Sequence, residues 1–292
     1  MPDFLTTKEL AELLRIKERK VYDLAASGAV PCSKAMGKLL FPRDAVDAWL
    51  AKNSSGFEGQ KEVQPRPDVF LGSHDPLLDW ALRESHSGIA TYFDGSADGL
   101  SRFERREGVA AGLHLYDAAA DDWNTPIVAD RCKAMPVVLI EWAKRQRGLI
   151  LSPRLKTSVL TIADLKGKRV TPRQGGSGAE NLFRHLLAEA GLSLSDLALT
   201  LPARTENDAA LMVLEDKADA TFGLAAIAAQ YRLPFMPIIE ERFDLLINRR
   251  AWFEPPLQRF FSLCHSSKLN TRAKDLEGYD LANFGHVHFN GS

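Results

Sequence analysis

The sequence predicts an α/β protein with two unlike parts, a small basic helical domain followed by a larger domain of strands and helices. In the first fifty residues, apolar positions recur with helical spacing and positive charge is concentrated. From residue 68 onward, short apolar runs alternate with helical patterns, which is typical of parallel sheets that bind ligands at the carboxyl ends of their strands. Between the two parts, residues 53–67 are polar and contain glycine and proline, which predicts a linker.

The first domain is predicted to span residues 1–52. Thr6 and Glu9 have the spacing of a capping box, and three leucines with i, i+3, i+4 spacing follow them. A second helix is expected to start at Lys20 and to end near Gly28, which suits a left-handed C-terminal position. The other expected elements are a short hairpin over residues 33–41 and a third helix over residues 42–50.

Positive charge in this first domain predicts a nucleic-acid partner. Residues 15–43 contain seven Lys or Arg and two acids, in a chain with a formal net charge of −1. Neutralisation of phosphates supplies most non-specific affinity for DNA, so a local excess of this kind is the expected footprint. The alternative is a protein-interaction module whose basic residues form a solvated face.

The motifs of this domain resemble the MerR/excisionase type of winged helix-turn-helix. The matching residues are Thr6, Glu9, Leu10, Ala11 and Leu14, then Val21, Tyr22 and Leu24, then Gly28, Val30 and Pro31. The resemblance implies that the second helix enters the major groove of double-stranded DNA and that the hairpin contacts the backbone or the minor groove. The DNA-binding residues expected on this basis are Lys17, Arg19, Lys20, Tyr22, Lys34, Lys38 and Arg43.

Composition excludes several classes of protein. The chain has 292 residues, of which 45% are hydrophobic, so it can bury a large core and exceeds one typical domain. The sequence contains no run of 18 apolar residues, so it predicts no membrane span. The N-terminus does not have the pattern of a secretory signal. Its three cysteines are far apart, which predicts neither a disulfide framework nor a zinc site. We therefore expect a cytoplasmic protein without a metal site or a cofactor.

Small polar residues or glycines stand where strands of the larger domain lead into helices. Such turns leave backbone N–H groups free at helix N-termini, where Ser and Thr hydroxyls add further donors. Several of these ends facing one cleft would form an anion site, although each turn taken alone is also an ordinary helix cap. The four turns are Gly72–Asp75, Asp94–Ser96, Gly175–Gly178 and Thr205–Asp208.

Taken together, these motifs resemble the type II periplasmic-binding-protein-like domain that is related to molybdate-binding proteins. The resemblance covers residues 69–279, and it implies two lobes within residues 68–292 that are joined by crossing strands near 138–143 and 238–247. Lobe 1 is expected over about 68–142 and 245–292, and lobe 2 over about 143–244. The matching residues are Gly72–Pro76, Gly95, Ser96, Gly99, Leu100, His114, Leu115, Asp117, Asn124, Pro126, Arg145, Gln146, Gly148, Leu149, Arg173–Gly178, Ala218, Asp219, Gly223 and Glu241–Leu245.

The resemblance implies a small oxyanion as ligand, with molybdate or tungstate as the first candidates and a small organic acid as the alternative. Arg173 has the geometry to meet a formal charge with two hydrogen bonds, unless it forms a salt bridge within its own loop. Glu206 departs from the family pattern, and we expect its carboxylate and that of Asp208 to point to solvent unless the ligand carries a donor or a positive group. The expected ligand-binding residues are Ser73, His74, Asp75, Ser96, Asn124, Arg173, Gln174, Ser177, Gly178, Thr205 and Glu206.

The sequence favours binding over catalysis. Ser73, His74 and Asp75 are consecutive, and three consecutive residues cannot form a catalytic relay. We therefore expect a one-component regulator of transcription, not an enzyme, that binds DNA as a homodimer and senses a small ligand by closing its lobes. The alternative is a solute-binding or storage protein that does not bind DNA.

Overall fold

The computed structural model describes residues 4–35, 37–53 and 65–292. The chain divides into two compact units, residues 1–65 and 66–292. Most of the linker expected over residues 53–67 lies outside the described residues. No helix in the described part of the chain is long and apolar enough to cross a membrane.

The N-terminal unit is a helix-turn-helix with a β-hairpin. Thr6 and Glu9 form the predicted capping box, and Gly28 has the predicted positive φ of 69°. The second helix begins at Glu18, two residues before the expected start at Lys20, because Lys17 already takes the extended conformation of an N-cap. The elements are β1 (Phe4–Leu5), α1 (Thr7–Leu14), α2 (Glu18–Ala26), β2 (Ser33–Ala35), β3 (Lys38–Pro42) and α3 (Arg43–Asn53).

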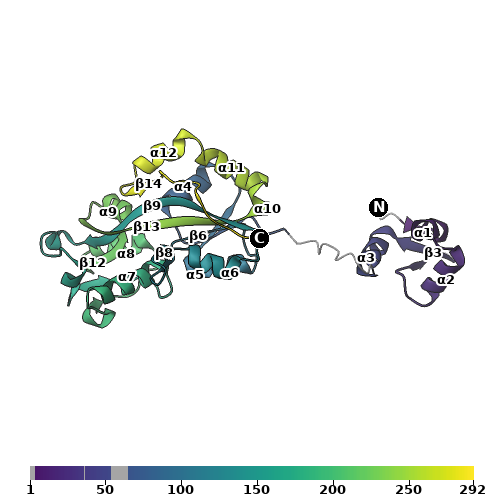
Figure 1. Cartoon of the computed structure of the whole chain (residues 1–292), viewed down its shortest axis with the longest axis horizontal. Helices are drawn as coiled ribbons and strands as arrows, with labels where there is room; N and C mark the ends of the chain where they lie inside the picture. The colour runs from purple at the N-terminus through teal and green to yellow at the C-terminus, as the bar shows by residue number, and fades with distance from the viewer. Residues whose placement is uncertain (1–3, 36, 54–64) are drawn as a thin grey trace. The chain divides into compact units, whose positions relative to one another are not determined.

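The larger unit is built on a mixed sheet with the strand order β11-β10-β12-β9-β13-β6-β4-β5. Two long strands, β9 (Val137–Leu151) and β13 (Phe235–Asn248), are antiparallel neighbours along most of their length. Figure 1 shows them running together from one half of this unit to the other. The short strands on either side are β4 (Val69–Gly72), β5 (Ala90–Phe93), β6 (Ala110–Leu113), β10 (Arg169–Thr171), β11 (Ala198–Leu199) and β12 (Ala220–Leu224), and β14 (Tyr279–Asp280) and β15 (Val287–Asn290) pair with β9.

Two groups of elements pack at opposite ends of β9 and β13, and we call them lobe 1 and lobe 2. Lobe 1 contains β4, β5 and β6, whereas lobe 2 contains β10, β11 and β12. Separate hydrophobic clusters fill the two lobes, one around Trp142 and Phe260 and another around Leu149 and Phe183. The helices of lobe 1 are α4 (Pro76–Glu84), α5 (Ser96–Glu104), α6 (Thr125–Cys132), α10 (Arg249–Trp252), α11 (Pro255–Cys264) and α12 (Ser267–Lys274), and those of lobe 2 are α7 (Gly178–Glu189), α8 (Glu206–Leu214) and α9 (Ala225–Gln230).

The predicted α/β fold class is confirmed, with one correction in detail. The sheet is mixed and not purely parallel, because β9 and β13 run antiparallel to each other and to their outer neighbours. Strand β6 ends at Leu113, after which the chain forms a two-stranded hairpin of β7 (Tyr116–Asp117) and β8 (Asp122–Trp123). The turn at His114 matters because it brings this side chain to the site described below.

Candidate functional site

A cavity of about 60 Å³ lies between the two lobes, beside the carboxyl ends of β4 and β10. A water molecule needs roughly 15 Å³ on the same measure, so this volume admits a compact ligand of a few non-hydrogen atoms. Its wall includes seven of the predicted ligand-binding residues: Ser73, His74, Arg173, Gln174, Ser177, Thr205 and Glu206. The turns that the sequence singled out therefore face one shared space.

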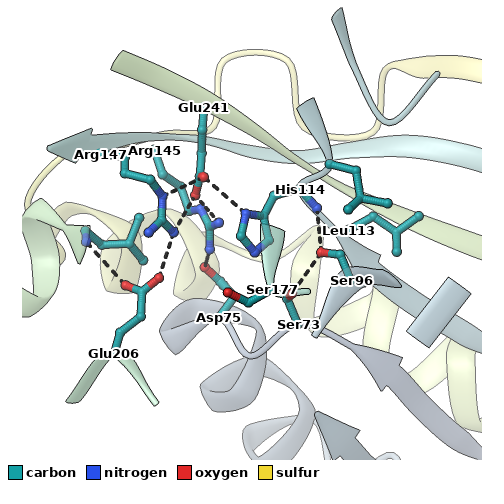
Figure 2. A network of polar contacts seen from close by, with 12 residues as sticks. Ser73, Asp75, Ser96, Leu113, His114, Arg145, Arg147, Ser177, Glu206 and Glu241 are labelled. Atoms are coloured by element: carbon teal, nitrogen blue, oxygen red, sulfur yellow. Dashed lines mark hydrogen bonds and ion pairs between the residues drawn. The ribbon is translucent and has the colours of Figure 1, made fainter. Parts of the chain in front are cut away.

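On the lobe 1 side, two serines form a hydrogen-bonded pair. The Oγ atoms of Ser73 and Ser96 lie 2.8 Å apart, and the Oγ of Ser96 accepts a hydrogen bond from the backbone N–H of His114 at 3.0 Å (Figure 2). Ser73 lines the cavity, whereas Ser96 is fully buried behind it. Ser96 therefore positions Ser73 from behind. The sequence predicted Ser96 as a ligand-binding residue, but it is not part of the cavity wall.

Three further predicted residues also lie behind the wall and have structural contacts. Asp75 caps α4 through the backbone N–H of Leu78 and accepts a hydrogen bond from Arg145 at 2.7 Å. Asn124 holds its turn through the backbone N–H of Leu115 at 2.6 Å. Gly178 lies so close to lobe 1 that a side chain there would come within 2.7 Å of the carbonyl oxygen of His114.

On the lobe 2 side, Arg173 has hydrogen-bonding capacity that the protein does not use. Its Nη2 atom donates to the carbonyl oxygen of Arg204 at 2.7 Å. Its Nε and Nη1 atoms are buried and have no hydrogen-bond partner among the described residues. Burial lowers the pKa of Arg173 from its usual value, although an arginine keeps its proton at any physiological pH. Arg173 therefore presents a charged group with free donors in the cavity wall.

Two helices of lobe 2 begin at the cavity. Ser177 caps α7 by accepting a hydrogen bond from the backbone N–H of Glu180 at 3.2 Å. Thr205 caps α8 by accepting one from the backbone N–H of Asp208 at 3.0 Å, and the Asp208 carboxylate completes the capping box. Both hydroxyl groups thus act as helix caps and also lie in the cavity wall, and the partial positive charge of each helix end lies nearby.

Glu206 does not point freely to solvent, which corrects one expectation from the sequence. Its Oε1 atom accepts a hydrogen bond from Arg147 Nη2 at 2.7 Å, and its Oε2 atom accepts one from the backbone N–H of Leu224 at 3.2 Å. Burial raises the pKa of Glu206, but Arg147 and Arg173 outweigh that effect and lower it overall. Glu206 is therefore an ionised carboxylate in the cavity wall.

Behind the cavity, a chain of buried charges joins the lobes through β9 and β13 (Figure 2). Asp75 binds Arg145, Arg145 binds Glu241, Glu241 binds Arg147 at 2.6 Å, and Arg147 binds Glu206. The neighbouring arginines hold the pKa of Glu241 well below its usual range, although burial acts in the opposite direction. The chain thus contains three carboxylates and two guanidinium groups.

Six residues of the cavity wall were not among the predicted ligand-binding residues, although Asp94 and Gly95 belong to a turn that the sequence singled out and His114 matches the family pattern. His114 is buried with its Nδ1 atom 3.2 Å from Glu241, and burial lowers its pKa, so the imidazole is neutral at neutral pH. Asp94 of lobe 1 meets Gln174 of lobe 2, with Oδ1 and Nε2 3.4 Å apart. One signal was available for the charge chain, because Arg145 and Arg147 are two residues apart on a strand and so share a face. The six residues are Phe93, Asp94, Gly95, His114, Ala179 and Arg204.

The residues predicted to bind DNA are on the surface of the N-terminal unit. Arg19, Lys20 and Tyr22 are exposed on α2, and Lys17 is at the N-cap of that helix. Arg43 begins α3 and lies 3.5 Å from Asp47. Lys34 and Lys38 are exposed on the two strands of the hairpin. This exposure is compatible with contact to DNA, which remains a prediction for each residue.

Comparison with known proteins identifies both parts of the chain. A helix-turn-helix domain model matches residues 4–54, and a PBP superfamily domain model matches residues 80–265. The uncharacterized protein YvgK of Bacillus subtilis (strain 168) is 25% identical over 299 residues, covering 97% of this chain and 96% of that protein. The regulatory domain of NMB2055 (MetR), a LysR family regulator from N. meningitidis, is similar in fold, with 12% identity, a TM-score of 0.50, and coverage of 73% of this chain and 97% of that one. The matches confirm the predicted fusion, which fits a ligand-responsive DNA-binding regulator.

Proposed function

This chain belongs to the PBP superfamily domain family and carries a helix-turn-helix domain, and we propose that it regulates transcription in response to a small anion. The observation that carries the proposal is Arg173, whose Nε and Nη1 atoms are buried without a partner in the wall of the cavity between the lobes. A buried donor that is left unsatisfied costs about 1–3 kcal/mol, and more when it is charged. A ligand with negatively charged oxygens would remove that cost.

The remaining wall agrees with an anionic ligand. Ser73 contributes a hydroxyl from lobe 1, and α7 and α8 contribute the positive ends of their dipoles from lobe 2. The resemblance to molybdate-binding proteins makes molybdate and tungstate the first candidates, and a small organic acid is the second. All of them carry the oxygens that Arg173 requires.

Closure of the lobes is the proposed response to the ligand. Gln174 already contacts Asp94 across the cavity, so a ligand held by both walls would stabilise this closed arrangement. Regulators that bind palindromic operators pair their DNA-binding domains, and we propose that this chain acts as a homodimer in which closure alters the placement of the paired domains.

The test is a gel shift of the full-length protein on the promoter of its own operon. We expect binding at low salt that weakens steeply as salt rises, since phosphate contacts release counterions. Molybdate, tungstate, phosphate and glycolate are each added in turn, and the anion that binds the cavity should change the affinity for DNA in the wild type and not in Arg173→Gln. Arg250→Gln is the matched control, because its side chain is exposed and is not part of the cavity wall. Absence of any DNA binding at low salt would overturn the regulator proposal.

A further inference from the structure

We infer that the cavity selects small anions that also carry a hydrogen-bond donor, and that Glu206 is the residue that imposes this selection. The inference rests on the proposed function, because it assigns a ligand class to the same cavity. It divides the candidate anions into two groups. Phosphate retains at least one hydrogen at neutral pH, and hydroxy acids such as glycolate carry a hydroxyl. Sulfate, molybdate, tungstate and acetate present only acceptor oxygens.

Glu206 has accepting capacity beyond its contacts within the protein. Each of its carboxylate oxygens receives one hydrogen bond, from Arg147 and from the backbone N–H of Leu224. An ionised carboxylate offers about four lone-pair sites, so about two remain. Its side chain is 17% exposed and belongs to the cavity wall, where a bound ligand would displace the water that otherwise fills those sites.

Arg147 does not fully neutralise Glu206, because Glu241 shares the same guanidinium. Glu241 accepts hydrogen bonds from Arg147 Nε at 2.6 Å and from Arg147 Nη2 at 3.0 Å. Three carboxylates and two guanidinium groups give the buried chain a formal charge of −1. Arg173 adds a positive charge nearby and attracts the anion as a whole, but a ligand oxygen without a hydrogen that lies against Glu206 still meets a carboxylate that repels it.

Arg173 sets the opposite requirement in the same small space. Its two free nitrogens need acceptor oxygens, while Glu206 needs a donor. A cavity of about 60 Å³ leaves little room for a bridging water beside a ligand, so the ligand itself must meet both needs. Asp94 is a weaker second acceptor, because its side chain is 41% exposed and already contacts Gln174 and Arg204.

The inference is tested by calorimetric titration of the full-length protein with two matched pairs of anions. Phosphate and sulfate are both tetrahedral, but only phosphate carries a hydrogen at neutral pH. Glycolate and acetate differ by one hydroxyl, which glycolate carries. In each pair that binds, we expect the donor-bearing anion to bind at least about tenfold more tightly, since an unsatisfied charged group costs more than about 1.4 kcal/mol. The phosphate and sulfate pair tests an inorganic ligand, and the glycolate and acetate pair tests an organic one. The pair that binds shows which of these two kinds of anion the cavity takes.

Two variants separate selection from a general change in charge. Glu206→Gln keeps the side-chain shape and offers an amide donor, so the preference within each pair should fall to near one or reverse. Asp94→Asn also removes a negative charge from the wall, so it should strengthen binding of both members of a pair, and it should change their ratio far less than Glu206→Gln does, because Asp94 is the weaker acceptor. The ratio of the two affinities depends on the group that accepts the ligand's hydrogen bond, whereas the loss of a negative charge changes both affinities in the same direction.

The outcomes distinguish this inference from the proposed function. Binding of sulfate or molybdate as tightly as phosphate, or an unchanged ratio in Glu206→Gln, overturns the selection and leaves an anion-responsive regulator standing. Absence of binding by every anion tested overturns both. The wild-type ratio decides the question even where Glu206→Gln does not fold.

Discussion

Arg145 and Arg173 are both buried arginines beside the same cavity, yet they have opposite surroundings. Arg145 lies between Asp75 and Glu241, so its charge is matched within the protein. Arg173 donates one hydrogen bond to a backbone carbonyl, and its other two nitrogens are buried without partners among the described residues. Arg145 also has one buried nitrogen, Nε, without a partner among the described residues, so the difference between the two side chains lies in their carboxylates. Two carboxylates bind Arg145, whereas Arg173 bonds to a backbone carbonyl, as expected for the ligand-binding role that we propose.

The largest expected effect belongs to Arg145. Arg145→Gln leaves Asp75 and Glu241 as buried carboxylates without their shared cation, and removal of one partner of a buried pair costs about 3–5 kcal/mol. The free energy of unfolding is measured by chemical denaturation. The control is Arg154→Gln, which removes two ion pairs of a half-exposed side chain, with Asp216 and Asp219, and should cost about 1 kcal/mol. Equal losses in the two variants would contradict the structural role of Arg145.

Arg173→Gln should show the reverse pattern. Without anion, its free energy of unfolding should stay within about 1 kcal/mol of the wild type, since the variant breaks one hydrogen bond and removes a buried charge. With an anion at 100 times its dissociation constant, the wild type should gain about 2.7 kcal/mol and the variant little. Thermal unfolding with and without phosphate, molybdate or glycolate measures the difference. If the anion stabilised Arg173→Gln as strongly as the wild type, Arg173 would not be a ligand-binding residue.

The two serines of lobe 1 should separate in the same way, with smaller effects. Ser73→Ala removes a hydroxyl from the cavity wall, and we expect roughly tenfold weaker anion binding in titrations. Ser96→Ala leaves the backbone N–H of His114 without its acceptor, so it should lower the free energy of unfolding by about 1–3 kcal/mol. If Ser73→Ala destabilised the protein and Ser96→Ala did not, it would be wrong to assign Ser73 to ligand binding and Ser96 to the support of the fold.

Two carboxylates on β13, those of Asp244 and Glu241, have pKa values shifted in opposite directions, and the free energy of unfolding should therefore depend on pH. Burial raises the pKa of Asp244 to about 7, whereas arginines hold that of Glu241 well below its usual range. The unfolded chain releases the Asp244 proton near pH 3.9, so between about 4 and about 7 the folded protein binds a proton that the unfolded chain lacks. The Asp244 contribution to the free energy of unfolding therefore falls as pH rises through this window, by at most about 1.4 kcal/mol per unit.

Asp244→Asn should remove this slope. The difference in the free energy of unfolding between wild type and variant is measured by chemical denaturation at several pH values from about 5 to about 8. Asp280→Asn, at an exposed position, serves as the control. Parallel profiles for the wild type and Asp244→Asn would show that Asp244 is already ionised throughout this range.

Much of the fold was predictable because its signals are local. The capping box of Thr6 and Glu9 and the left-handed Gly28 depend on residues within a few positions of each other. The mixed direction of the sheet was not predictable in the same way, since the 83 residues 152–234 separate β9 from β13 in the sequence. Seven predicted residues reached the cavity wall because they follow the carboxyl ends of β4 in lobe 1 and of β10 and β11 in lobe 2, and these ends lie on the two sides of the cavity.

By itself, the sequence determined the pair of domains, the turns at which helices begin, and the polar character of those turns. Only the tertiary structure decided which polar side chains face the cavity and which lie behind it. Asp75 and Arg145 are 70 residues apart, and Arg145 and Glu241 are 96 residues apart. Whether a buried charge finds a partner depends on such distant contacts, because the free energy of a buried ion is set by its neighbours in space.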